Sequence, residues 1–310
     1  MKDKTKRKIK NITICTLTFL VLNKGIKLVK NRNIALEVMS NHENITTHAS
    51  NLVAHRGFSG MYPDNSYISI NKAINMPCVN LIEIDVRLTN DNTLVLHHDA
   101  SFSIDDLIVS IASLNLSDIE EDLVINDFNL YNLSDLTSND LLFLYKRYLN
   151  KNKNVNYLIR LKNLIPFYME STDKNLIIDI KTSNKDITLM EELDGILSGY
   201  KNRIYLQTDS YDFLIEMKNK YPDYKYLYII NYKKDLDKMN IDITGFTIKY
   251  SLFNKIKFDE DKMYFVYTIN SSEKYFNLIN NKNYNNNMYI ITDNPDYICG
   301  LEKTKVLEKR

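Results

Sequence analysis

The sequence contains little glycine and proline and no tryptophan. Seven Gly and five Pro occur in 310 residues, so we expect each at a position whose backbone conformation requires it. Two of the glycines, Gly57 and Gly60, stand in the stretch VAHRGFSGMYPDNS at 53–66, directly after a short apolar run. This clustering predicts a strand that ends in a tight loop, with His55 and Arg56 at the edge of the loop.

The sequence also has few cysteines and almost no net charge. Three cysteines are too few and too widely spaced for a disulfide framework or a zinc site, and they are compatible with any compartment. The 40 basic and 39 acidic residues leave a formal net charge of +1, so the composition predicts no nucleic-acid partner. The chain is long enough for one large α/β barrel or two ordinary domains. The cysteines are Cys15, Cys78 and Cys299.

The first 30 residues (1–30) differ from the rest of the chain. Residues 1–10 carry six basic and one acidic residue, and 12–22 form an uncharged apolar run of eleven. This pattern predicts a signal peptide or, because no small-x-small cleavage site follows, an uncleaved anchor, although a full membrane span needs about 20 residues. We therefore expect a membrane-anchored protein with an extracytoplasmic catalytic domain, or a secreted one. An amphipathic helix packed on the domain is the alternative, and the polar residues 31–50 read as a linker.

From residue 51 onward, short β-rich runs alternate with stretches of 3.6-residue apolar spacing. Such alternation predicts parallel strands joined by helical crossovers. The turn NDN at 90–92 is too short for a crossover, so the runs on either side of it should form an antiparallel hairpin. Eight parallel strands remain, the number in a (β/α)8 TIM barrel, which we place at 51–305. The nine runs are 51–55, 80–89, 93–98, 175–181, 203–208, 224–230, 245–250, 263–270 and 288–293.

Residues 99–170 interrupt this rhythm after the second barrel strand. They contain LSDIEED, LSDLTSNDLLFLY and a stretch rich in Tyr, Lys and Asn, which predict a mostly helical insertion. The aromatic side chains of this segment either pack the insertion itself or cover a lipid chain.

Acidic side chains recur inside two of the predicted interior strands. In LIEIDVRLT, the period of two places Glu83 and Asp85 on one face, where adjacent carboxylates repel each other unless a cation bridges them. In NLIIDIK, Asp179 and Lys181 share a face in the same way. Alone, this second pair reads as a structural ion pair. Beside Glu83 and Asp85, however, Asp179 supplies a third oxygen ligand, and Lys181 offers a positive charge to a phosphate.

Three of the five histidines fall at the ends of predicted strands next to these acids: His55, His97 and His98. Two imidazoles on opposite sides of a bound phosphorus could act as general base and general acid, each worth about 10²–10⁴-fold in rate. A single histidine is more often a hydrogen-bonded scaffold residue. Three of them at one edge, beside three acids, favour catalysis.

These motifs together resemble the glycerophosphodiester phosphodiesterase family over about residues 51–300. The resemblance is specific because several short motifs agree in order and spacing, although each alone is a weak signal. The motifs are AHRG (54–57), PDNS (63–66), EIDVRLTNDNTLVLHHD (83–99) and IDIK (178–181), with weaker matches at YTIN (267–270) and TDNP (292–295).

The resemblance implies a TIM barrel of the phospholipase C-like phosphodiesterase type. It also implies metal-dependent release of an alcohol from a glycerol-phosphate diester, often assisted by the glycerol hydroxyl of the substrate itself. The implied site consists of His55 and His98 as the catalytic pair, Glu83, Asp85 and Asp179 around one Ca²⁺ or Mg²⁺, and Arg56 and Lys181 on the phosphate.

The sequence departs from the family pattern at three places. PDNS replaces the usual Pro-Glu-Asn-Thr, and we expect Asp64 to cap the following helix. Asp179 stands where the family usually has Glu, so its carboxylate reaches about one methylene less far and the metal preference stays open. HHD has two histidines where the family usually has one. Alignment to the following Asp99 favours His98 over His97 as the catalytic residue.

Several substrate classes fit these motifs. The partner is a small-molecule or lipid-derived phosphodiester. The alternatives are a lysophospholipase D, a sphingomyelinase D-like transferase, or a phosphodiesterase of polyglycerol-phosphate wall polymers. A non-catalytic barrel that binds phosphoglycerol polymers is disfavoured, because all the histidines and carboxylates that catalysis requires are present.

Overall fold

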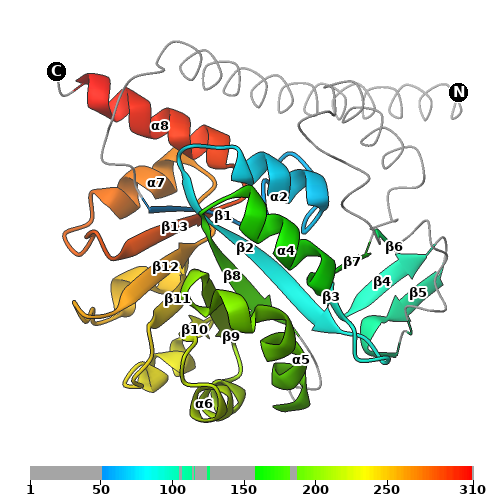
Figure 1. Ribbon diagram of the computed structural model, residues 1–310. Coiled ribbons are helices and arrows are strands. Elements are labelled where there is room, and N and C mark those ends of the chain that lie inside the picture. Colours follow the sequence, from blue (N-terminus) through cyan, green and yellow to red (C-terminus); the bar gives the residue numbers. More distant parts are fainter. Residues whose placement is uncertain are drawn as a thin grey trace, which may run out of the picture. The chain divides into compact units, whose positions relative to one another are not determined.

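The computed structural model describes most of the chain from residue 51 onward (Figure 1). The predicted anchor or signal peptide at 1–30 and the linker at 31–50 lie outside the described residues. Among the helices of the described part, none has both the length and the apolar character needed to cross a bilayer. The described ranges are 51–104, 107–113, 115, 124–125, 158–181 and 187–308.

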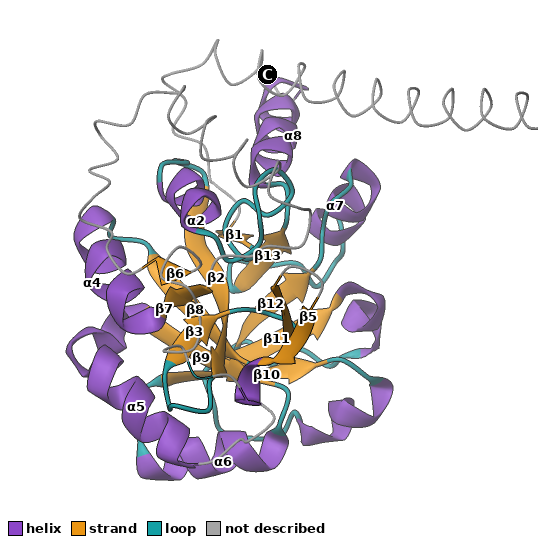
Figure 2. Ribbon diagram, turned by 90° about the vertical axis from the view of Figure 1, so that its right-hand side faces the viewer, coloured by secondary structure: helices purple, strands orange, loops and turns teal. Residues whose placement is uncertain are grey.

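Eight parallel strands close into a barrel, which confirms the predicted fold (Figure 2). The strand β1 pairs with both β2 and β13, and this double pairing closes the sheet into a ring. Each barrel strand lies within or overlaps one of the predicted runs. In ring order, the strands are β1 (Asn51–Ala54), β2 (Val79–Leu88), β8 (Asn175–Ile180), β9 (Ile204–Thr208), β10 (Lys225–Ile230), β11 (Gly245–Lys249), β12 (Met263–Tyr267) and β13 (Met288–Thr292).

The helices that connect the barrel strands cover the outside of the barrel (Figure 2). In α2, the residues Ile70, Ala73 and Ile74 follow the i, i+3, i+4 spacing and are buried, as an amphipathic crossover requires. The α-helices are α2 (Tyr67–Ile74), α4 (Leu161–Ser171), α5 (Ile187–Leu197), α6 (Tyr211–Lys220), α7 (Ser272–Ile279) and α8 (Pro295–Glu308), and the 3₁₀ helices are η1 (Ile111–Ser113), η4 (Ser198–Arg203), η5 (Lys233–Lys238) and η6 (Tyr250–Lys255).

The hairpin predicted after the second barrel strand is confirmed, because β3 (Leu94–Leu96) pairs antiparallel with β2. Most of the predicted helical insertion at 99–170 lies outside the described residues, and its described part contains both helix (η1 and most of α4) and short strands. There, β4 (Ser101–Ile104) and β5 (Leu107–Ser110) form a second hairpin. The short strands β6 (Val124–Ile125) and β7 (Leu158–Arg160) extend the sheet beyond β3. Strands this short carry too few residues for a visible period of two.

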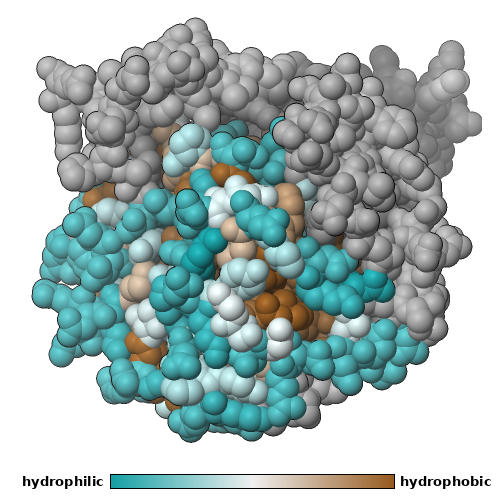
Figure 3. Space-filling view, viewed as in Figure 1, coloured by the Kyte–Doolittle hydropathy of each residue, from teal (hydrophilic) through white to brown (hydrophobic). Residues whose placement is uncertain are grey.

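The inside of the barrel is filled by one apolar layer with a polar layer above it. Seven strands each contribute one buried residue to the apolar layer. Where the residues of the face drawn in Figure 3 are coloured, they are mainly hydrophilic, with smaller hydrophobic patches between them. Because alternate residues of a strand share a face, the next inward position lies two residues further along each strand. The apolar layer consists of Val53, Leu81, Ile177, Tyr205, Leu227, Phe265 and Ile291.

The cysteines differ from the expectation. Cys78 and Cys299 are disulfide-bonded, although their number and spacing predicted no disulfide framework. A disulfide requires only that two sulfurs meet in space with suitable geometry. Spacing along the sequence does not report that condition.

Candidate active site

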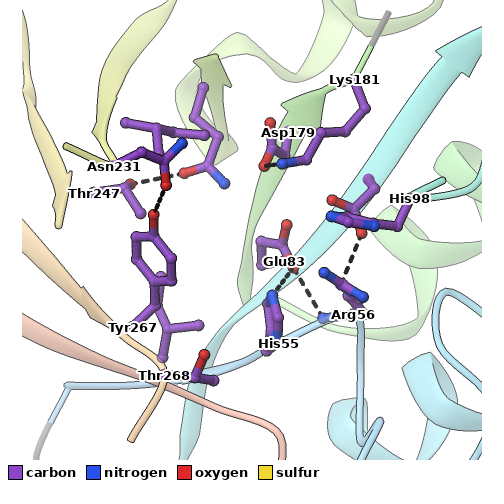
Figure 4. Close-up of a pocket in the computed structure, with 14 residues that line it drawn as sticks. His55, Arg56, Glu83, His98, Asp179, Lys181, Asn231, Thr247, Tyr267 and Thr268 are labelled. Carbon is purple, nitrogen blue, oxygen red and sulfur yellow. Dashed lines mark hydrogen bonds and ion pairs between the residues drawn. The ribbon is translucent and has the colours of Figure 1, made fainter. Parts of the chain in front are cut away.

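A polar pocket of about 310 Å³ opens at the carboxyl ends of the barrel strands (Figure 4). This end of a TIM barrel is where enzymes of the fold place their active sites. All seven residues predicted for the site line the pocket. The lining residues are His55, Arg56, Glu83, Asp85, His98, Asp179, Lys181, Gln207, Ile229, Asn231, Thr247, Tyr267, Thr268 and Ile291.

The backbone turns sharply behind His55, as the sequence predicted. Arg56 and Gly57 have φ values of 54° and 76°, in the left-handed region that glycine adopts most readily. A Cβ at Gly57 would lie 2.5 Å from the backbone of Ser69. Gly60 donates its N–H to the loop after β13, where a side chain would also collide. The two glycines therefore let the loop fold tightly under the pocket.

Glu83, Asp85 and Asp179 form a buried acidic cluster. They are 1%, 1% and 4% exposed, and one carboxylate oxygen of each lies within 4.8 Å of the others. Burial, followed by the charge of Asp85, raises the pKa of Glu83 to about 8. Burial also raises the pKa of Asp179 to about 6, although Lys181 opposes this change. Three such acids share one site favourably when protons or a cation offset their repulsion.

The donor set of this cluster fits a hard divalent cation. Asp179 Oδ2 lies 2.9 Å from Lys181 Nζ, whereas its buried Oδ1 has no hydrogen-bond partner among the described residues. A buried carboxylate oxygen normally has a partner. Oxygen ligands from several carboxylates are those that Mg²⁺ and Ca²⁺ prefer. These three residues therefore form the candidate metal centre.

Arg56 connects the loop to both acids of β2. Its backbone N–H donates to Glu83 Oε2 at 2.9 Å, its Nε lies 3.0 Å from Asp85 Oδ2, and its Nη1 donates to Asp64 Oδ2 at 2.6 Å. Burial alone would lower the pKa of the guanidinium, but these acids outweigh burial and raise the pKa. Arg56 is thus a fixed positive charge at the pocket wall.

The PDNS motif has a different role from the one expected. Asp64 does not cap α2, because its carboxylate pairs with Arg56. The cap is Ser66, whose side chain accepts a backbone N–H of the first turn. Asn65, with a φ of 54°, donates to Asp85 Oδ2 and accepts from the Asp85 N–H, each at 2.9 Å. The motif therefore orients a candidate metal ligand as well as starting a helix.

His55 lies between two acids. Its Nδ1 is 2.5 Å from Asp293 Oδ1, and its Nε2 is 3.9 Å from Glu83 Oε2. Burial by itself lowers the pKa of His55, but the hydrogen bond to Asp293 and the charge of Glu83 outweigh burial and raise the pKa. Asp293 was not predicted as a site residue. The signal that could have found it was its place in the TDNP motif.

The two adjacent histidines after β3 have different environments. His98 lines the pocket with its side chain 37% exposed, and its Nδ1 lies 2.9 Å from Asp99 Oδ1. His97 is buried, with Nε2 3.0 Å from the Ser101 carbonyl, and burial lowers its pKa. Arg87 Nε donates to the His98 carbonyl at 2.8 Å and so holds the backbone there. Of the pair, His98 is the one that lines the pocket.

The opposite wall of the pocket is polar but uncharged, and sequence reasoning missed it. Thr247 Oγ1 donates to Gln207 Oε1 at 2.7 Å, and the Tyr267 hydroxyl donates to Asn231 Oδ1. Burial raises the pKa of Tyr267, so its phenol keeps the proton. A single neutral polar residue in an apolar strand carries no motif signal, and of the uncharged polar pocket residues only Tyr267 and Thr268 fell within a motif noted above, YTIN.

Known structures share this fold. A putative glycerophosphoryl diester phosphodiesterase from Silicibacter pomeroyi matches with a TM-score of 0.61 at 14% identity, covering 88% of this chain and 98% of that one. A glycerophosphodiester phosphodiesterase from Thermotoga maritima matches at 0.56 and 20% identity, covering 82% and 99%. An Oleispira antarctica phosphodiesterase in complex with the product sn-glycerol-3-phosphate matches at 0.57 and 18%, covering 82% and 97%.

Sequence comparison gives the family directly. The putative glycerophosphodiester phosphodiesterase YhdW of Bacillus subtilis (strain 168) is 42% identical over 48 residues, which are 16% of this chain and 19% of that protein. The sequence model of the glycerophosphoryl diester phosphodiesterase family matches residues 55–296, well over half of the chain. Both predicted histidines and all three acids of the metal centre fall inside that match. The chain belongs to the glycerophosphoryl diester phosphodiesterase family.

Proposed function

We propose that this chain hydrolyses glycerophosphodiesters to an alcohol and glycerol 3-phosphate with one divalent cation. The observation that carries the proposal is the convergence of two imidazoles, three carboxylates and two cationic side chains at one pocket. Family membership supports it, as does the related Oleispira antarctica structure that contains sn-glycerol-3-phosphate.

The two histidines would carry the protons of the reaction. A hydroxyl oxygen of water, or of the substrate's own glycerol, attacks phosphorus, and the bond from phosphorus to the alcohol oxygen breaks. One imidazole, of His55 or His98, takes the proton of the attacking hydroxyl. The other gives a proton to the departing oxygen. If the glycerol hydroxyl attacks, water opens the resulting cyclic phosphate in a second step. Each histidine would be worth about 10²–10⁴-fold.

The cationic side chains would bind the phosphate. Burial lowers the pKa of Lys181, but Asp179 and Asp85 outweigh burial and raise it, so Lys181 stays charged like Arg56. Fixed positive charge in a partly buried site stabilises the charge that develops on phosphoryl oxygens. A divalent ion held by Glu83, Asp85 and Asp179 would add Lewis-acid polarisation of the phosphate when bound.

A lysophospholipid is the second candidate substrate, which would make the chain a lysophospholipase D. The observation that favours it is Tyr232, a large hydrophobic side chain that is 63% exposed. Tyr232 directly follows the pocket residue Asn231. An exposed aromatic ring directly after a pocket residue could contact an acyl chain of the substrate.

Product release tests the proposal. Purified protein is incubated with glycerophosphocholine, a lysophospholipid or poly(glycerol phosphate), in EDTA, Mg²⁺ or Ca²⁺. We expect glycerol 3-phosphate from the first substrate, no turnover in EDTA, and recovery with one of the ions. Release from the lysolipid or the polymer alone would transfer the assignment to that substrate. Metal-independent binding without turnover of any of the three would contradict the enzymatic assignment.

We further propose that the barrel works outside the cytoplasm, attached to the membrane through residues 1–30 or secreted. The disulfide bonding of Cys78 and Cys299 supports this location, since disulfides persist mainly in oxidising compartments. Alkylation of free thiols in intact producing cells, before lysis, tests the location. We expect both cysteines to resist alkylation until a reductant is added, and ready labelling of both would contradict it. Alkaline extraction of membranes would separate anchored protein from secreted protein.

A further inference from the structure

We propose that Asp293 and Asn270 act as positioning residues, which hold the His55 ring so that proton exchange with the substrate runs through Nε2. The kinetic part of this inference rests on the proposed function, whereas its structural part does not. The two residues come from the motifs TDNP and YTIN, which were the weaker matches in the sequence. They lie at the ends of neighbouring strands, β13 and β12.

The first contact in this arrangement is between His55 and Asp293. Nδ1 of His55 lies 2.5 Å from Asp293 Oδ1. Burial raises the pKa of the Asp293 carboxyl, but the hydrogen bonds from His55 and Asn270 outweigh burial and lower it. An ionised carboxylate accepts hydrogen bonds and donates none, so Nδ1 must carry the proton of the pair. In neutral His55 the free lone pair is then on Nε2.

The second contact holds Asp293 itself. Asn270 Nδ2 donates to Asp293 Oδ2. The side-chain oxygen of Asn270 accepts the Asp293 backbone N–H at 2.9 Å and the Thr292 hydroxyl at 3.0 Å. Both ends of the Asn270 amide are therefore engaged with one short segment of chain, which fixes the direction of the Asp293 carboxylate.

The backbone of His55 is tied to the same segment. The His55 N–H donates to the Thr292 carbonyl at 2.9 Å. Ser59 Oγ donates to the His55 carbonyl at 2.7 Å and lies 3.3 Å from Asp293 Oδ1. With main chain and Nδ1 both fixed, the ring has one remaining direction for Nε2. It faces the pocket, 3.9 Å from Glu83 Oε2 (Figure 4).

This arrangement predicts a specific tautomer of His55, which can be observed without any activity. The full chain is labelled with ¹⁵N-histidine, and the His55 signals are assigned with a His55→Gln variant. At a pH where the ring is neutral, we expect the Nδ1–H form. In Asp293→Ala, where the acceptor is missing, we expect the Nε2–H form that free histidine prefers in water. Asp293→Glu keeps a carboxylate and should retain the Nδ1–H form at least in part.

Kinetics then separates positioning from folding. Asp293→Ala should lower kcat by about 10²–10⁴-fold, the worth of one acid–base group, with KM changed less than about threefold. Asn270→Ala, which keeps the carboxylate but releases it, should lower kcat less, and Asp293→Glu should recover part of the loss. Asp242→Ala is the matched control, because among the described residues that exposed aspartate pairs with Lys218 and Lys262, away from the pocket lining, and its loss should leave kcat and tautomer unchanged.

Each outcome of these measurements supports or overturns the positioning role. Retention of the Nδ1–H form in Asp293→Ala, or a kcat within about threefold of the parent chain, would overturn the proposal. If Asp293→Ala fails to fold, Asn270→Ala decides, and an unchanged kcat there would also overturn it. If the parent chain hydrolyses no glycerophosphodiester, the tautomer measurement still decides the positioning role while the proposed function fails separately.

Discussion

Asp85 of β2 and Asp179 of β8 are register partners on neighbouring parallel strands. Two acids that face each other in this way repel across the sheet, and burial of both amplifies the repulsion because it removes solvent screening. Glu83 lies two residues before Asp85 and extends the cluster along the same face. This single alignment of two strands explains why the pocket has the chemistry of a cation site, and it leads to several predictions.

Replacing Asp179 should separate metal binding from folding. In Asp179→Asn, we expect a higher Tm than the parent chain in EDTA, because one buried charge is removed. We also expect loss of the Tm increase on adding Mg²⁺ or Ca²⁺, an increase worth about 2.7 kcal/mol at a hundredfold excess over Kd. Asp179→Glu is the control that keeps the charge and should keep the increase. Thermal melts with and without metal check this, and an equal metal response in Asp179→Asn would exclude Asp179 as a ligand.

Stability without metal should fall as the pH rises. Glu83 has a pKa of about 8 in the folded state against 4.5 as a free side chain, and the pKa of Asp179 is also raised, to about 6. At these two carboxyls the folded state therefore binds more protons than the unfolded state. Their contribution to the free energy of unfolding is complete below about pH 4 and is lost as the pH approaches about 8. We expect Tm in EDTA to decrease over this window and to decrease less in Mg²⁺ or Ca²⁺. A Tm in EDTA that rises towards pH 8 would contradict the buried cluster.

Gly57→Ala should destabilise the loop that carries His55. The left-handed φ and the 2.5 Å approach of a Cβ to the Ser69 backbone together should cost more than about 1 kcal/mol. Gly195→Ala in α5 is the matched control, because no atom of the described residues lies within 4 Å of that Cβ and Ala favours a helix by about 0.5–1 kcal/mol. Urea denaturation of both variants measures the difference. Equal stabilities would contradict the strain assigned to Gly57.

The two neighbouring histidines should respond differently to the same substitution. His98→Ala should lower kcat by about 10²–10⁴-fold with little change in Tm, because its half-exposed ring lines the pocket. His97→Ala should mainly lower Tm, because it removes a buried ring that contacts the Ser101 carbonyl. Kinetics and melts of both variants give the comparison. A larger kcat loss in His97→Ala would exchange the two roles.

The sequence by itself determined the barrel and most of the pocket. A period of two within an apolar strand assigns Glu83 and Asp85 to one face, and a three-residue turn forces the hairpin that carries His98 towards them. These are local properties, since strand alternation and turn length depend on residues close in sequence. The resemblance to the family added the order of the motifs and therefore the roles expected of the seven site residues.

Tertiary structure decided the remaining relationships, because they join residues whose separation no local pattern encodes. Asp293 meets His55 across 238 positions only because β1 and β13 close the ring. Asp64 does not cap the helix, because the loop folds back so that its carboxylate lies 2.6 Å from Arg56 Nη1, and Ser66 is the cap instead. The uncharged wall opposite the acids likewise depends on which strands the closed barrel brings together.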